Sequence, residues 1–214
     1  ELYEENSFNL DNAVQKLINK EKLSTYEIFL IYNNILESDL KVESDRDKNK
    51  KVMESLFDYF SNNGYLQNAI DLGNIMISNF SDDRDEKIEK AELINVIAGL
   101  EYRKGKYSPS LLHLKETLRI FEELNMKIKS AQVYSNLSSI YFILQEYDKS
   151  LEFINKSLRM APEKKFPEIY SKSLNNKGVT LYAIGKKDDA LECFLKAVEI
   201  KERFKDESSL INSY

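Results

Sequence analysis

Side chains that commonly carry out catalysis are rare in this sequence. His113 is its only histidine and Cys193 its only cysteine. A catalytic base or nucleophile needs a partner that orients or activates it, and the sequence offers neither residue a second histidine. We therefore interpret His113 as a histidine satisfied within the fold and Cys193 as a structural thiol.

Short motifs for metal, nucleotide or acyl-transfer chemistry are also absent. The sequence contains no HExxH, GxGxxG, GxxxxGK[ST] or GxSxG. The acidic run at residues 82–86 has the composition of a calcium loop, but it lacks the glycine and the correctly spaced glutamate that such a loop requires. We interpret this run as the solvated start of a helix. The sequence predicts no catalytic residue, no metal site and no cofactor, and hence no enzyme.

Opposite charges are interleaved along the chain. Lysine and arginine number 31, aspartate and glutamate number 36, and the formal net charge is −5. A nucleic-acid-binding surface would be basic, and no apolar run approaches the roughly 18 residues of a membrane span. We predict that this segment binds neither nucleic acid nor a membrane. Because the sequence opens at Glu1 without methionine and stops abruptly at Tyr214, we expect an excised segment, so the cytoplasm and the periplasm both stay open as its location.

The composition and an internal repeat predict the elements that hold these side chains. Glycine (6) and proline (3) are scarce, and 42% of the residues are hydrophobic, which predicts helices joined by short connections. Three segments align without gaps. They are AELINVIAGLEYRKGKYSPSLLHLKETLRI from Ala91, AQVYSNLSSIYFILQEYDKSLEFINKSLRM from Ala131 and SKSLNNKGVTLYAIGKKDDALECFLKAVEI from Ser171. Their starts lie 40 residues apart (131 − 91 and 171 − 131), which is the signature of a repeat architecture.

Side-chain size follows the same register in the three segments. Small residues recur at Ala98, Ser138 and Gly178, at Ser110, Ser150 and Ala190, and at Thr117, Ser157 and Ala197. Large apolar residues recur at Leu111, Leu151 and Leu191. Small residues allow two helices to approach closely, and large ones fill the space between layers. The pattern therefore predicts a stack of helix pairs.

These segments resemble the tetratricopeptide repeat. In the third segment Leu174, Gly178, Leu181, Ala190, Phe194 and Ala197 fall on the positions that define this repeat, and Pro162 matches the terminal proline of the second. The period is longer than the roughly 34 residues of the standard repeat, which longer helices accommodate, and the sequence has no tryptophan. The resemblance implies an all-α fold, a right-handed α-solenoid of antiparallel helix pairs.

We expect one domain over residues 1–214. Its clear repeats are 91–130, 131–170 and 171–207. Residues 45–90 form a degenerate repeat, residues 1–44 form two N-terminal helices that act as a degenerate repeat or a cap, and residues 208–214 begin a further helix or a tail.

Capping and turn residues agree with this layout. Ser24 and Glu27 form a capping box, and Ser108 before Pro109 predicts a helix N-cap. Left-handed turns within the pairs are expected at Gly64, Gly105 and Gly185, and at Gln145 in place of glycine.

In tetratricopeptide arrays the first helix of each pair lines the concave face. The family's groove positions give nine candidate ligand-binding residues here: Asn95, Tyr102, Ser135, Asn136, Ser139, Phe142, Asn175, Asn176 and Tyr182. An asparagine amide both donates and accepts, so it can pair with a peptide unit of an extended ligand whatever the ligand's side chains. The aromatic residues would add apolar contact area. The segment Leu174-Asn175-Asn176 is also similar to the Leu-Asn-Asn element of peptide-binding arrays such as kinesin light chain.

The resemblance implies a protein- or peptide-binding module, similar in repeat style to the sensory or scaffold arrays of larger bacterial signalling proteins. One alternative is a structural or adaptor array that forms homodimers through its end helices, with Leu210 and Ile211 exposed. A second is a relative of peptide-regulated phosphatases or transcription regulators, although no catalytic residue of such a phosphatase is identified. Lys172 lacks the basic partners of the carboxylate clamp in chaperone-binding arrays, so an acidic C-terminal peptide is not expected as the ligand.

Overall fold

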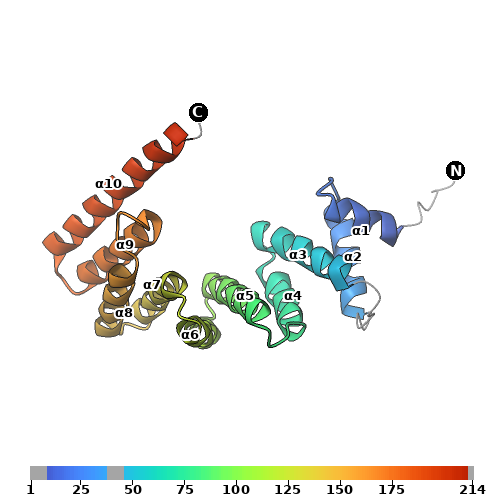
Figure 1. Ribbon diagram of the computed structural model, residues 1–214, viewed down its shortest axis with the longest axis horizontal. Coiled ribbons are helices and arrows are strands. Elements are labelled where there is room, and N and C mark those ends of the chain that lie inside the picture. The colour runs from blue at the N-terminus through green and yellow to red at the C-terminus, as the bar shows by residue number, and fades with distance from the viewer. Residues whose placement is uncertain (1–8, 38–45, 212–214) are drawn as a thin grey trace. The chain divides into compact units, whose positions relative to one another are not determined.

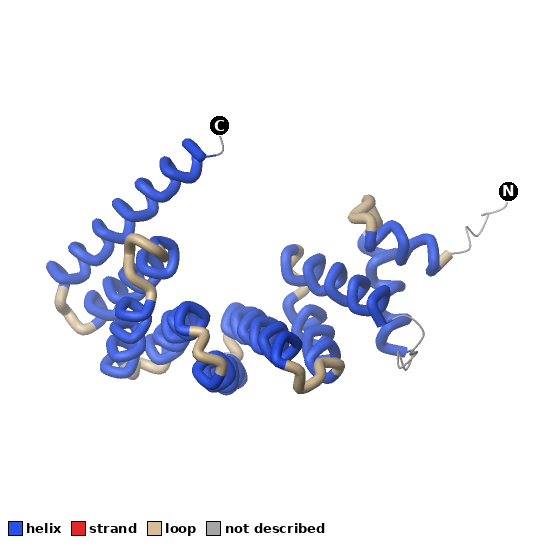
Figure 2. Tube along the Cα trace, viewed as in Figure 1, coloured by secondary structure: helices blue, strands red, loops and turns tan. Residues whose placement is uncertain are grey.

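The computed structural model describes residues 9–37 and 46–211. Within these residues the chain forms ten helices and no strand (Figure 1, Figure 2). The all-α prediction is therefore confirmed. The helices fall into two compact units, Glu1–Phe80 and Ser81–Tyr214, which we describe separately.

The first unit contains four helices: α1 (Leu10–Ile18), α2 (Thr25–Glu37), α3 (Arg46–Asn62) and α4 (Leu66–Ser78). The capping box predicted before α2 is present, because the Ser24 amide donates to Glu27 Oε2 at 2.8 Å and the Glu27 amide donates to Ser24 Oγ at 3.2 Å. The core of this unit is aromatic. Phe60 is fully buried, and its ring centroid lies 4.9 Å from that of Tyr32.

The second unit contains three consecutive helix pairs. They are α5 (Arg84–Arg103) with α6 (Tyr107–Glu123), α7 (Lys127–Ile143) with α8 (Tyr147–Met160), and α9 (Pro167–Ala183) with α10 (Lys187–Ile211). The second helices begin at residues 107, 147 and 187, so their starts are 40 residues apart, as the repeat predicts. Helix α10 runs without a break to Ile211, so residues 208–211 extend this helix and begin no new one.

The turns within the pairs confirm the predicted left-handed residues. The φ angles are +84° at Gly64, +74° at Gly105, +60° at Gln145 and +84° at Gly185. The next amide then bonds back over the end of the first helix, for example Lys106 N to Glu101 O at 2.8 Å, which is the Schellman pattern.

The predicted N-cap at Ser108 is wrong. Helix α6 begins at Tyr107, and its N-cap is Lys106, which makes no side-chain capping bond. The preceding turn at Gly105 sets this start, at the same register as in the other two pairs. Pro109 therefore lies in the first helical turn, where its missing amide hydrogen is not needed.

The start of α5 confirms the interpretation of the acidic run. Asp83 caps the helix, and its side chain accepts a hydrogen bond from the Asp85 amide at 3.1 Å. Asp85 and Glu86 follow in the first turn, where the helix dipole favours negative charge.

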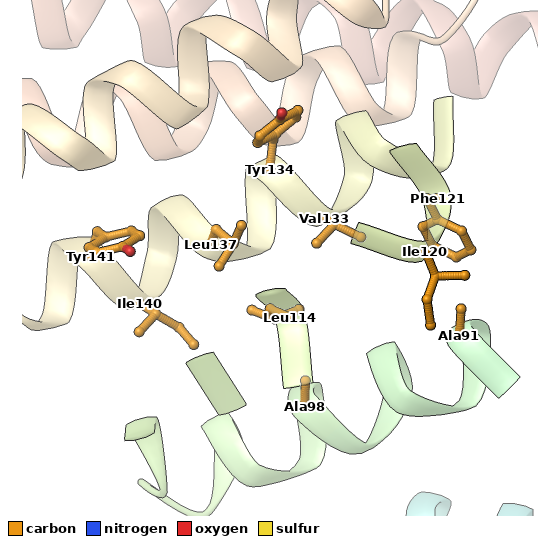
Figure 3. Close-up of a cluster of buried hydrophobic side chains, with 10 residues drawn as sticks. All are labelled: Ala91, Ala98, Leu114, Ile120, Phe121, Val133, Tyr134, Leu137, Ile140 and Tyr141. Atoms are coloured by element: carbon orange, nitrogen blue, oxygen red, sulfur yellow. The ribbon is translucent and has the colours of Figure 1, made fainter. Parts of the chain in front are cut away.

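Hydrophobic side chains of α5, α6 and α7 converge into a shared core (Figure 3). The small residues of the repeat lie where the two helices of a pair cross, and those with a hydroxyl on the second helix bond to main-chain carbonyl groups of the first helix. Ser110 Oγ donates to Ala98 O at 2.7 Å and Ser157 Oγ donates to Ala131 O at 2.8 Å. In the last pair a Cβ on Gly178 would lie 2.6 Å from Phe194 Cε1, so glycine is required there.

Candidate functional site

The first helices of the three pairs contact one another directly, α5 with α7 and α7 with α9. Hydrogen bonds join their polar side chains across these contacts. Asn136 Nδ2 donates to Asn95 Oδ1 at 3.2 Å, and Lys172 Nζ donates to Asn136 Oδ1 at 2.9 Å. One residue from each first helix thus takes part in a continuous chain of hydrogen bonds.

A second set of bonds joins α9 to α7. Asn176 Nδ2 donates to Ser135 O at 3.0 Å and lies 3.1 Å from Ser139 Oγ. Ser135 is fully buried, whereas Asn176 and Ser139 are half-buried. We call the six residues Asn95, Ser135, Asn136, Ser139, Lys172 and Asn176 the polar row.

A family model described as Tetratricopeptide repeat matches residues 129–203. This segment holds most of α7, all of α8 and α9 and most of α10, with every residue of the polar row except Asn95. This part of the chain is built from tetratricopeptide repeats. No significant match was found among curated protein sequences.

Solved structures with the same architecture extend over nearly the whole chain. The apo form of RapI matches with a TM-score of 0.73 at 18% identity, over 92% of this chain and 70% of that one. A putative kinesin light chain from Podosopora anserina, with nearly identical tetratricopeptide-like repeats, matches with a TM-score of 0.64 at 11% identity, over 92% and 94%. A Rap protein complexed with Competence and Sporulation Factor matches with a TM-score of 0.66 at 17% identity, over 94% and 56%. At these identities the likeness shows the fold.

The tetratricopeptide register explains how the polar row forms. Asn95, Ser135 and Asn175 are fifth in their repeats, and Asn136 and Asn176 are sixth. Each sixth residue bonds to the fifth residue of the preceding repeat, 41 positions earlier (136 − 95 and 176 − 135). Asn175 points elsewhere: its side chain is exposed, and it has no hydrogen-bond partner in the part of the chain that the structure describes.

Lys172 is the cation of the polar row. Its side chain keeps contact with solvent, while desolvation lowers the pKa of the ammonium group and neighbouring Glu168 acts in the opposite direction. An ion pair borders the other end of the row, where Lys129 Nζ lies 2.6 Å from Glu92 Oε1 across α5 and α7. Sequence reasoning missed this ion pair.

The three aromatic candidates differ in exposure. Tyr102 packs edge-on against Tyr107, with ring centroids 5.7 Å apart, and burial raises the pKa of its hydroxyl group. Phe142 packs against Tyr147 at 5.8 Å. Tyr182 is 61% exposed, so its ring presents the largest open apolar surface of the three.

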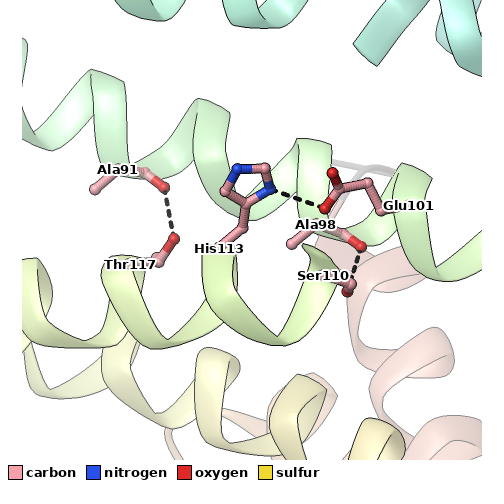
Figure 4. A network of polar contacts seen from close by, with 6 residues as sticks. All are labelled: Ala91, Ala98, Glu101, Ser110, His113 and Thr117. Atoms are coloured by element: carbon pink, nitrogen blue, oxygen red, sulfur yellow. Dashed lines mark hydrogen bonds and ion pairs between the residues drawn. The ribbon is translucent and has the colours of Figure 1, made fainter. Parts of the chain in front are cut away.

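Glu101 and His113 form a polar contact inside the first pair of the second unit (Figure 4). Glu101 is buried, and its Oε2 lies 2.8 Å from His113 Nδ1. At the same register, 40 residues later, Tyr141 stacks on Phe153 with centroids 5.2 Å apart. His113 therefore has a hydrogen-bond partner within the fold, as expected for a structural histidine. Because Glu101 takes the buried position, its neighbour Tyr102 lies at the edge of the core.

The remaining reactive groups are not gathered into a site. Cys193 is half-buried, and burial raises the pKa of its thiol, which disfavours the nucleophilic thiolate. Among the described residues, no group of three or more histidine, cysteine, aspartate or glutamate side chains could hold a metal ion. None of the helices in the described ranges is long and apolar enough to cross a bilayer.

Proposed function

We propose that the chain binds an extended segment of another protein along α5, α7 and α9. The observation that carries this proposal is the polar row, in which three successive first helices contribute amide and hydroxyl groups to one face. Stacked repeats present such a face at regular intervals. An extended chain presents peptide groups at regular intervals as well, so amide side chains can pair with them without reading the sequence.

The hydrogen bonds divide the candidates into two roles. Asn136 bonds to α5 and α9, and Asn176 bonds to Ser135 of α7, so we assign these three residues to positioning the helices. Asn175 is exposed, and Asn95 uses only its carbonyl oxygen. We assign direct contact with the ligand's main chain to Asn95 and Asn175, and apolar contact to Tyr182, with Tyr102, Phe142 and Ser139 beside them.

We further propose that this binding serves signalling, as the sensory or scaffold part of a larger bacterial protein. The likeness to RapI, and to a Rap protein complexed with Competence and Sporulation Factor, supports this context. A fold of this type accommodates a bound factor in that relative. Binding that changes the packing between repeats could then shift an attached output domain between two states.

The test is a selection of random linear dodecapeptides displayed on phage against the immobilised chain. A selected peptide is then titrated calorimetrically into the protein in solution. We expect saturable binding that is lost on heat unfolding and is weakened by Asn175→Ala. If the selection yields no peptide that binds the folded protein, the proposal fails.

A second candidate function is self-association through α10. Val198 is 52% exposed, whereas Leu158, at the same register in α8, packs against residues of the following pair, including Leu174. Leu191 and Leu195 are exposed on the same face. The side chains of Leu210 and Ile211 lie outside those that the structure describes.

This candidate makes a separate prediction for light scattering. Asn155 in α8 has the same position in its repeat as Leu195 in α10. The substitution Leu195→Asn therefore introduces a residue that the repeat already contains at this position. A dimer that dissociates in this variant supports association through α10. A strict monomer at every concentration contradicts it.

A further inference from the structure

Helix α5 contains a glycine that its own packing does not require. Gly99 is exposed in the last two turns of the helix, and a Cβ there would meet no heavy atom within 4 Å. Glycine is less favourable than alanine inside a helix because it loses more conformational freedom on folding. The fold thus loses helix stability at Gly99 and gains no close helix contact in return, in contrast to Gly178.

The same register is filled in the other two first helices. Ser139 takes it in α7, where its hydroxyl lies 3.1 Å from Asn176 Nδ2. Val179 takes it in α9 and is half-buried. Gly99 is therefore the one position of the three where the helix main chain is left uncovered.

The residues around Gly99 offer both a donor and apolar walls. Asn95 lies one turn before it on the same face. Asn95 Oδ1 accepts from Asn136, but within the described residues nothing accepts from Asn95 Nδ2. Val96, at 45% exposure, and the half-buried Tyr102 lie three residues to either side of Gly99.

We infer that the main chain of an extended peptide crosses α5 directly over Gly99, with one of its carbonyl oxygens accepting from Asn95 Nδ2. An asparagine side chain is short, so a peptide carbonyl reaches it only if the ligand's main chain comes close to the helix. Glycine is the residue that permits such a close approach. This inference rests on the proposed peptide-binding function and names Gly99 as the residue that sets the depth of the bound chain.

The experiment uses a phage-selected dodecapeptide and three variants of the full chain. Gly99→Ala is expected to raise the thermal midpoint of unfolding by roughly 2–4 °C, because alanine favours the helix. It is expected to weaken binding about tenfold, because the added methyl group overpacks the contact. Stability and affinity thus change in opposite directions.

Asn95→Asp tests the donor. The carboxylate still accepts from Asn136 but has no hydrogen to donate, so affinity for the selected peptide should fall about tenfold. The matched control is Leu112→Ala, an exposed position on the second helix α6, which should leave the affinity unchanged.

The outcomes separate this inference from the proposed function. If the peptide binds the wild type and Gly99→Ala with equal affinity, the inference is overturned while peptide binding stands. If no peptide binds the wild type at all, the proposed function fails, and the inference with it. If light scattering shows a dimer that Gly99→Ala dissociates, a second copy of the chain occupies this position, and the inference is overturned.

Discussion

Asn136 of α7 donates a hydrogen bond to Asn95 of α5 at 3.2 Å, although the two residues are 41 positions apart in repeats that are 40 residues long. The sixth residue of one repeat therefore lies against the fifth residue of the repeat before it. Asn176 and Ser135 repeat this relationship one pair later. The stagger between neighbouring first helices, together with the repeat length, sets which polar groups meet.

Gly99 and Gly178, the two glycines inside described helices of the second unit, should respond oppositely to alanine. Gly178→Ala places a methyl group 2.6 Å from the Phe194 ring, so we expect a loss of about 1–3 kcal/mol in the free energy of unfolding, as for an overpacked core. Gly99→Ala adds a methyl group in open space and should raise stability by up to about 1 kcal/mol. Urea unfolding monitored by circular dichroism measures both. Equal changes in the two variants would contradict the assigned packing.

The Glu101 and His113 pair should be replaceable by its counterpart from the next repeat. Tyr141 and Phe153 occupy the same register and stack on each other. We expect the double variant Glu101→Tyr with His113→Phe to be at least as stable as the wild type, because a packed apolar pair can replace a buried polar one. Each single variant should be less stable than the double variant.

A double-mutant cycle in urea measures this coupling. We expect an interaction energy of about 1 kcal/mol or more between the two positions. Additive effects of the two substitutions would show that the buried position does not depend on its partner.

Tyr134 should make the fold sensitive to alkaline pH. Burial, reinforced by its hydrogen bond to Glu122, raises the pKa of Tyr134 from its ordinary value of 10.0 to about 12. Because the folded pKa lies above the unfolded one, the stabilisation is fully present below about pH 10 and is lost as the pH rises toward about 12. The shift corresponds to about 2–3 kcal/mol.

Tyrosinate absorbance during a pH titration checks this expectation. In the wild type, the tyrosinate signal from Tyr134 should appear only near the pH of unfolding, and Tyr134→Phe should remove that late component. The variant should also lose part of the stability difference between neutral and alkaline pH. Superimposable titrations of wild type and variant would count against the assignment.

The repeat in the sequence predicts the helix pairs because small residues recur every 40 positions, where two packed helices must approach closely. Ala98, Ser138 and Gly178 lie where helices cross, and the second helices start 40 residues apart as expected. The N-cap at Ser108 could not be predicted from propensity, because the turn at Gly105 sets the start of α6. That the described helices form two compact units, dividing after Phe80, was not indicated by the sequence either.

The sequence predicted which residues lie along the first helices, but not which of them bond to a neighbouring helix and which face solvent. Asn175 and Asn176 are adjacent and identical in type, yet only Asn176 bonds to α7. Which of the two faces solvent depends on the rotation of α9 about its axis and on its stagger against α7. The 41-residue offset between polar residues could have indicated the answer. The uncovered main chain at Gly99 could not be predicted in the same way. Whether a glycine in a helix is required by packing depends on the atoms around it, which the sequence does not show.

The paired asparagines give the most direct test of peptide binding at the polar row. Asn175→Ala and Asn176→Ala are compared with the wild type by calorimetric titration of a selected peptide and by urea unfolding. We expect Asn175→Ala to weaken binding by about 0.5–1.5 kcal/mol, the typical value of one hydrogen bond, with unchanged stability. Asn176→Ala should lower the free energy of unfolding by about 1–3 kcal/mol, because it leaves half-buried acceptors without their donor. Peptide binding that is unaffected by Asn175→Ala, in a variant as stable as the wild type, would contradict the account.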